Sequence, residues 1–218
     1  MARVTMRGSG RCVKGARRCR LLKAAGTSVT PVLPLVLIDV DGVLNALSET
    51  GAWADLRTGE AVAQGRSYPI RWSPMVVERV VSWCGIADVQ WLTTWGHDAN
   101  SSLRHLVWLP ELPVAGTHDG AAAAGSLDAG AAHAAVTPAA PDALTGQWWK
   151  FDVVRRLVRE DPSRPMVWLD DDLVNQHEIC SWMGSSAMAL VLAPDGASGL
   201  VVADLDAVDA YLWRELIG

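Results

Sequence analysis

One stretch, residues 34–45, restricts the possible folds of this chain more than any other. It reads PLVLIDVDGVLN, an apolar run followed by two aspartates, Asp39 and Asp41, with one residue between them. The length and β-branched content of residues 33–38 predict a strand that is buried on both faces. Asp39 and Asp41 then follow its carboxyl end, where open α/β sheets present their ligand sites. The alternation points both side chains to one side, and Gly42 permits a turn and the close approach of a ligand.

The rest of the chain alternates between apolar runs typical of strands and amphipathic patterns typical of helices. Further strands are expected over residues 89–93, 166–169 and 188–192, with a short candidate at 112–115. Helices are expected over about 74–84, 98–107, 148–159, 176–183 and 204–216. This order predicts an α/β fold, a Rossmann-like parallel sheet with helices on both faces. Residues 46–71 have no clear period and are expected to form a long loop or a hairpin.

Two of the expected helices begin next to residues that can cap them. Ser73 precedes Pro74 and is a plausible N-cap for the first helix. Asp98 or Asn100 can cap the second. Residues at helical spacing predict the apolar face of the first helix, which is expected to consist of Val76, Val77, Val80, Val81 and Cys84.

Charge and composition divide the chain into a tail and a body. The first 30 residues contain eight of the 19 basic residues and no acidic one, so the tail carries +8 and the remainder −13. We expect the tail, residues 1–30, to be disordered and solvated. Residues 31–218 are long enough for one sizeable core and are expected to form a single domain. Within it, residues 116–146 are rich in Ala and Gly and are expected to be a flexible insertion.

Several protein classes are disfavoured by the sequence. No run approaches the roughly 18 apolar residues of a membrane span. Arg17 and Arg18 faintly resemble a twin-arginine export signal, but the one apolar segment that such a signal needs is required as the first strand. We therefore expect a cytoplasmic protein. The four cysteines show no CxxC pair or zinc-like spacing, so they are expected to be reduced, with Cys84 and Cys180 in the core.

Polar residues follow three of the predicted strands. These are Asp39 with Asp41, then Thr93, then Asp170 with Asp171. If the strands are parallel, their carboxyl ends share one edge of the sheet and these side chains can converge. Carboxylates brought so close repel one another unless a cation joins them. Mg²⁺ suits a site with few carboxylates, some waters and a phosphate. Calcium is less expected, because the sequence contains no looped run of oxygen ligands.

Lys150 adds a cation to this set. It is the only lysine after the tail, and it lies beside Trp148 and Trp149 near a predicted helix start. A surface lysine is the simpler interpretation, but a helix start is an unfavourable place for a positive charge. An ammonium suits pairing with phosphoryl oxygens and a buried carboxylate. Together these residues indicate metal-assisted phosphoryl transfer through an aspartyl-phosphate.

Four motifs in this order resemble the haloacid dehalogenase superfamily, over the chain from about Leu33 to its end. They are DVDGVL at 39–44, WLT at 91–93, Lys150, and WLDD at 168–171. The phrases DVDGVLN, WLTTWGHDAN, WWK and VWLDDDL further resemble the haloacid dehalogenase domains associated with "Swiss army knife" RNA-repair proteins. The spacing between the motifs leaves no room for a large cap domain, which implies an open site.

The resemblance implies a role for each matched residue. Asp39 would be the nucleophile and a Mg²⁺ ligand, and Asp41 the acid/base, with its backbone carbonyl on the metal. Thr93 would bind the phosphoryl group, although Thr94 is an adjacent candidate. Lys150 would stabilise the phosphoryl group and orient Asp39.

The fourth motif would complete the metal site. Asp171 would ligate Mg²⁺ directly or through water, with Asp170 in support. Asp172 is a third carboxylate in a motif that needs two, so the choice among the three stays open.

The function that follows from the resemblance is a Mg²⁺-dependent phosphatase. Its substrate could be a small phosphate ester, a phosphoprotein or a nucleic-acid end. One alternative is a phosphatase that processes RNA ends in a repair context. Another is a catalytically silent module that binds a partner through this fold. A glycosyltransferase, suggested by the Asp-x-Asp pattern, would not require Thr93, Lys150 and the later acidic cluster.

Overall fold

The computed structural model describes residues 32–49, 53–118 and 148–217. The basic tail and nearly all of the Ala/Gly-rich insertion, about which the sequence makes predictions, lie outside the described residues. The chain divides into two units, Met1–Pro31 and Val32–Gly218, and all described residues belong to the second.

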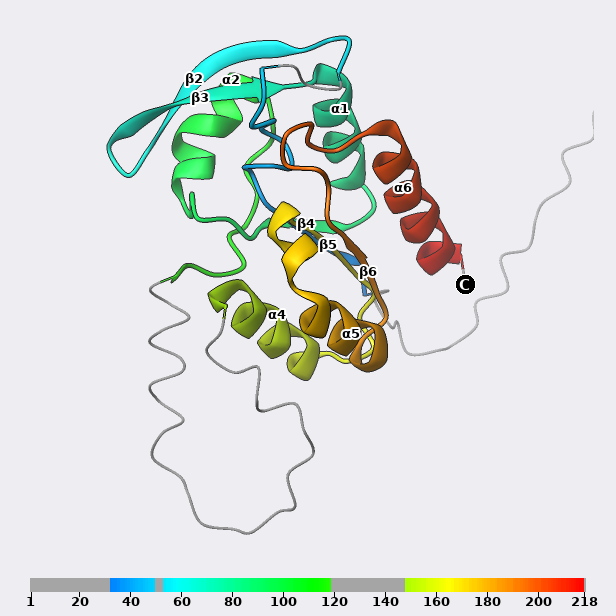
Figure 1. The fold of residues 1–218 in the computed structure, drawn as a ribbon. Coiled ribbons are helices and arrows are strands. Elements are labelled where there is room, and N and C mark those ends of the chain that lie inside the picture. Colours follow the sequence, from blue (N-terminus) through cyan, green and yellow to red (C-terminus); the bar gives the residue numbers. More distant parts are fainter. Residues whose placement is uncertain (1–31, 50–52, 119–147, 218) are drawn as a thin grey trace, which may run out of the picture. The chain divides into compact units, whose positions relative to one another are not determined.

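A four-stranded parallel sheet forms the centre of this unit, in the order β4-β1-β5-β6 (Figure 1). Its strands run in register and lie where the sequence predicts them: β1 Leu35–Ile38, β4 Asp88–Trp91, β5 Met166–Leu169 and β6 Ala189–Leu192. The short candidate strand at 112–115 is wrong, because only Val114 forms an isolated bridge, with Trp91. The α/β fold with a parallel sheet is confirmed.

Helices cover both faces of the sheet, as predicted (Figure 1). Helices α1 (Pro74–Trp83) and α6 (Val202–Ile217) lie on one face, and α4 (Trp149–Glu160) and α5 (His177–Ser186) on the other. Alternate strand residues point to opposite faces, so β1 contributes Val36 and Ile38 to one apolar core and Leu35 and Leu37 to the other. All four are buried, which explains why this strand reads as a continuous apolar run. None of the described helices has the length and apolar character needed to cross a membrane.

Helix α1 begins as the sequence predicts but buries a slightly different face. The Ser73 hydroxyl caps it by accepting a hydrogen bond from the Val76 amide at 3.2 Å. Val81 was expected in the apolar face, yet it is 42 % exposed, and Trp83 is buried instead. The Trp83 indole crosses to α6 and donates to Asp209, a contact that helical spacing alone does not reveal. The two cysteines predicted in the core, Cys84 and Cys180, are free thiols that are only half-buried.

The helix predicted over 98–107 is irregular. It starts as a π-helix, η1 (Ala99–Leu103), and continues as α2 (Arg104–Val107). Asp98 occupies the N-cap position, as expected, but its side chain forms no capping hydrogen bond to the backbone, and the alternative cap at Asn100 is wrong. Asp98 accepts from the Gln64 amide, while Asn100 lies inside the π-helix and bonds both Trp91 and Leu112.

Residues 46–71, expected as a long loop or a hairpin, contain a hairpin. Its strands are β2 (Arg57–Ala63) and β3 (Arg66–Trp72), joined by Gln64 and Gly65, both with positive φ. Two such residues form the tight turn that suits the twist of a hairpin. The hairpin packs along η1 and α2, where the Val62 amide donates to the Ser102 hydroxyl at 2.7 Å. In the described chain between β1 and α1 there is no larger insertion, in agreement with the absence of a large cap domain.

Candidate functional site

The carboxyl ends of three neighbouring strands bring polar side chains together. Asp39 directly follows β1, Asp170 directly follows β5, and Thr93 lies two residues after β4. Backbone hydrogen bonds continue the sheet past the strand ends, since the Asp39 amide donates to Leu169 and the Leu92 amide to Ile38, both at 3.0 Å. Asp39, Thr93 and Asp170 are all buried. The sheet therefore holds these side chains on rigid backbone.

Three carboxylates at this edge form a compact group. Ligand oxygens of Asp39, Asp170 and Asp171 lie within 4.8 Å of one another, and Asp171 is the least buried of the three. It is the one group of this kind among the residues that the structure describes. Asp172 is exposed and outside the group, and its amide donates to Asp170 at 3.2 Å at the start of the 3₁₀-helix η4 (Asp171–Asn175). Of the three acidic residues in the fourth motif, the structure thus places Asp170 and Asp171 beside Asp39.

Lys150 reaches this group from helix α4. It lies in the first turn of α4, only 1 % exposed. Its ammonium donates to Asp39 at 2.5 Å and to Asp170 at 2.7 Å. The Trp148 ring lies 5.5 Å from the same nitrogen and stacks on Trp168 of β5. A lysine that sequence reasoning placed near a helix start is therefore a buried counter-ion of two carboxylates.

The electrostatics of the group favour an additional cation. Burial raises the pKa of Asp39 despite the opposing charge of Lys150. Burial, together with the charge of Asp39, raises the pKa of Asp170 to about 8, and burial, Asp172 and Asp39 raise that of Asp171 to about 6. Burial alone would lower the pKa of Lys150, but the charges of Asp39 and Asp170 raise it overall. When ionised, three carboxylates and one ammonium leave two negative charges, which a divalent cation would neutralise.

The residues around the group also fit a hard metal ion. All three side chains offer carboxylate oxygens, the donors that Mg²⁺ and Ca²⁺ prefer. Two glycines make room for Asp171, because a Cβ atom on either Gly42 or Gly196 would collide with its carboxylate. Gly42 also has a φ of +69°, which side chains rarely adopt. The acidic cluster can therefore hold a metal ion, and the Asp171 carboxylate packs against the backbone of Gly42 and Gly196.

Asp41 lies outside the three-carboxylate group and has its own partners. One carboxylate oxygen accepts from the Asn45 amide group at 2.7 Å, and the other accepts from the Trp95 indole at 2.8 Å. The predicted contact of its backbone carbonyl with a metal stays a prediction. Asn45 and Trp95 were missed as functional candidates, although the first lies four residues after Asp41 and the second two residues after Thr93.

The two threonines are clearly distinguished by their surroundings. The Thr93 hydroxyl is buried, hydrogen-bonds to the Asp39 carboxylate and accepts from the Trp95 amide at 3.2 Å. Thr94 is exposed, and its backbone carbonyl accepts from the Gln64 side chain at 3.3 Å. Thr93 rather than Thr94 therefore adjoins the carboxylate group.

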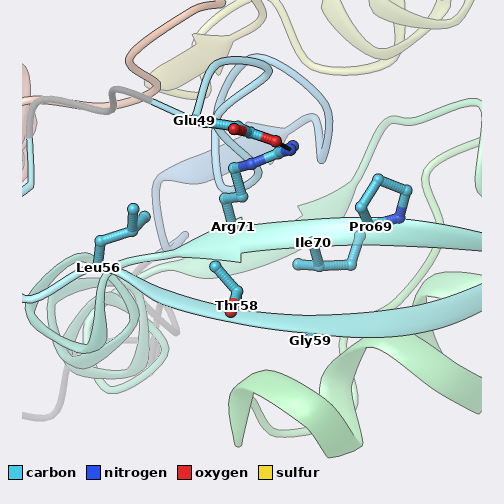
Figure 2. A pocket seen from close by; sticks show the side chains of 7 residues that line it. All are labelled: Glu49, Leu56, Thr58, Gly59, Pro69, Ile70 and Arg71. Carbon is cyan, nitrogen blue, oxygen red and sulfur yellow. Dashed lines mark hydrogen bonds and ion pairs between the residues drawn. The ribbon is translucent and has the colours of Figure 1, made fainter.

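A separate hollow of about 360 Å³ lies on the hairpin (Figure 2). Arg71 reaches across it to Glu49, with 3.3 Å between their charged atoms. None of the carboxylates described above lines this hollow, whose walls come from Glu49, Leu56, Thr58, Gly59, Pro69, Ile70 and Arg71. It is therefore distinct from the acidic site.

Comparisons of the chain with models of protein families, with curated proteins and with solved structures found no match. The class that the fold and the site define is an α/β protein whose parallel sheet, in the order β4-β1-β5-β6, carries a buried acidic cluster at its carboxyl edge.

Proposed function

We propose that the protein is a Mg²⁺-dependent phosphohydrolase that cleaves phosphate monoesters through an aspartyl-phosphate on Asp39. The observation that supports this most is the pair of hydrogen bonds from Lys150 to Asp39 and Asp170, with Asp171 close enough to share a cation. The order of these residues also matches the motifs of the haloacid dehalogenase superfamily that the sequence resembles.

The first half of the reaction would form the covalent intermediate. An Asp39 oxygen attacks phosphorus, a bond from this oxygen to phosphorus forms, and the bond to the leaving oxygen breaks. Asp41 gives its proton to that leaving oxygen, which departs as an alcohol. Lys150 and Thr93, which hydrogen-bond to Asp39, would hold the phosphoryl oxygens. A bound Mg²⁺ would neutralise charge between the nucleophile and the phosphoryl group.

The second half would return the enzyme to its starting state. Asp41, now ionised, takes a proton from water as the water oxygen attacks phosphorus. The bond between phosphorus and Asp39 breaks, and inorganic phosphate leaves. Asp170 holds Lys150 throughout, so the lysine keeps its orientation between the two carboxylates.

The size of the substrate follows from the surroundings of the site. The described chain carries a hairpin and no large cap between β1 and α1. Such an arrangement suits an unselective small ester as well as a bulky one, including the nucleic-acid end that the RNA-repair resemblance suggests. A panel of aryl phosphate, alkyl phosphate and 3′- or 5′-phosphorylated oligonucleotides separates these substrates.

The test is hydrolysis by the full chain in Mg²⁺, in EDTA, and by Asp39→Asn. We expect activity with Mg²⁺ and none in EDTA or in the variant. Asp206→Asn, a surface aspartate on α6 that pairs with Arg79, is the matched control and is expected to keep full activity. Activity that survived the loss of Asp39 or of the metal would refute the mechanism. A folded protein that cleaves no ester in the panel would favour the silent binding module.

A further inference from the structure

We propose that Trp95 and Asn45 are positioning residues that aim the Asp41 carboxylate, and that strand β3 of the hairpin holds both of them. The inference rests on the proposed function, in which Asp41 transfers protons to and from the reacting oxygens. It assigns a role to two side chains that the four motifs do not include.

Two hydrogen bonds fix the Asp41 carboxylate. Each of its two oxygens accepts one hydrogen bond, from Asn45 at 2.7 Å and from Trp95 at 2.8 Å. Both donor residues are buried, Asn45 at 4 % and Trp95 at 5 % exposure, so water competes little for these bonds. Two donors on opposite oxygens restrict rotation of the carboxylate, which fixes the direction in which it faces.

Both donors contact the same strand, β3. The Asn45 side-chain oxygen accepts from the Arg71 amide at 2.8 Å, and the Ala46 amide donates back to the Arg71 carbonyl at 2.9 Å. The Trp95 ring contacts Tyr68, with ring centroids 5.6 Å apart. Arg71 and Tyr68 both belong to β3. The hairpin therefore sets the position of both groups that hold Asp41.

Trp95 contacts two of the residues proposed to act in catalysis. Its backbone amide donates to the Thr93 hydroxyl at 3.2 Å, and Thr93 in turn bonds Asp39. Its indole donates to Asp41. The amide bond is open to any residue at position 95, whereas the indole bond to Asp41 is specific to tryptophan. Trp95 thus contacts the acid/base directly and the nucleophile's neighbour Thr93 through its amide, and its ring packs on Tyr68 of the hairpin.

A comparison of leaving groups separates positioning from packing. A nitrophenolate leaves without a proton, whereas an alkoxide needs one from Asp41, so misplacing Asp41 harms alkyl phosphates most. The quantity to measure is kcat/KM, which reports the step in which the leaving group departs. Trp95→Phe keeps the ring against Tyr68 and removes only the indole N–H. Trp83→Phe is the matched control, since it removes an indole N–H from the carboxylate of Asp209, on helices away from the site.

We expect Trp95→Phe to lower kcat/KM for an alkyl phosphate by roughly tenfold or more, a fraction of what general acid catalysis supplies, and to leave p-nitrophenyl phosphate nearly unchanged. Trp83→Phe should change neither. An equal loss on both esters, or no loss on either, would overturn the inference. If the wild type cleaves neither ester, the proposed function fails, and the catalytic role of Trp95 fails with it.

A second measurement does not depend on activity. The indole N–H resonance of Trp95, assigned by its absence in Trp95→Phe, should shift when Asp41→Asn replaces the carboxylate oxygen that accepts its hydrogen bond. The Trp83 resonance should not move. A Trp95 resonance that ignores Asp41→Asn would show that the contact is absent in solution, and the inference would fall whatever the kinetics show.

Discussion

Replacing Lys150 with methionine tests the electrostatic core of the site directly. The ammonium is almost fully buried and donates two short hydrogen bonds to carboxylates that are themselves buried. Methionine has a similar volume, so the change leaves little cavity and mainly removes the charge. Removing one partner of a buried ion pair leaves an uncompensated charge and costs about 3–5 kcal/mol.

The lower end of that range is the better expectation for this site. Asp170, whose pKa burial and Asp39 raise to about 8, already retains a proton at neutral pH and so carries little of the charge that loses its partner, which limits the loss. We therefore expect Lys150→Met to lower the free energy of unfolding by about 3 kcal/mol in metal-free buffer. The loss should shrink on acidification, because the stranded carboxylates become neutral. Saturating Mg²⁺ should restore part of it by supplying the missing positive charge.

Urea denaturation at several pH values is the assay, with an unchanged m-value as the sign that the denatured state is unaltered. Arg156→Met on the same helix is the control, since its pair with Glu160 is half-exposed at 3.6 Å and is worth about 0.5 kcal/mol at most. If Lys150→Met costs no more than this control at neutral pH, the ammonium is not the counter-ion of the acidic group, and the electrostatic argument is wrong.

Two further predictions concern the acidic cluster. Gly42→Ala should weaken binding of Mg²⁺ or Mn²⁺, measured by titration calorimetry, because the new methyl group collides with Asp171. Gly65→Ala, with a similar φ of +74° but open space around its Cβ position, should keep wild-type affinity, and equal losses would contradict the collision. Without metal, stability should fall as the pH rises from about 4 to about 8, because folded Asp170 retains a proton that the unfolded chain releases. Asp170→Asn should flatten that slope in thermal unfolding curves, and an unchanged slope would assign it to other groups.

Local patterns predicted most of the fold. Apolar runs of strand length and the amphipathic helices between them are properties of short segments, and β1 or α1 can be recognised from its own residues. The errors lie where distant contacts outweigh the local pattern. Trp83 is buried because α6 offers Asp209 to its indole. The Asp98 side chain forms no capping hydrogen bond, since its carboxylate accepts from the hairpin amide of Gln64.

The candidate site could also be predicted in part. Polar residues after buried strands converge whenever those strands are parallel, so Asp39, Thr93 and Asp170 can be grouped from the sequence alone. The donors on Asp41 could not be found in this way. Trp95 lies 54 residues from Asp41 in the chain, and nothing in the spacing indicates that its indole points at that carboxylate.

The amino-acid order alone therefore specifies a parallel sheet with carboxylates at one edge, because burial and strand-end polarity are encoded within segments of a few residues. Tertiary packing decides the rest. It packs the Asp171 carboxylate against glycine backbone and leaves Asp172 outside the acidic cluster. It also inserts Lys150 between two aspartates that lie 111 and 20 residues away from it in the chain. It also ties Asp41 to the hairpin through Trp95. These contacts join residues far apart in the chain, so they exist only once both cores have closed around the sheet.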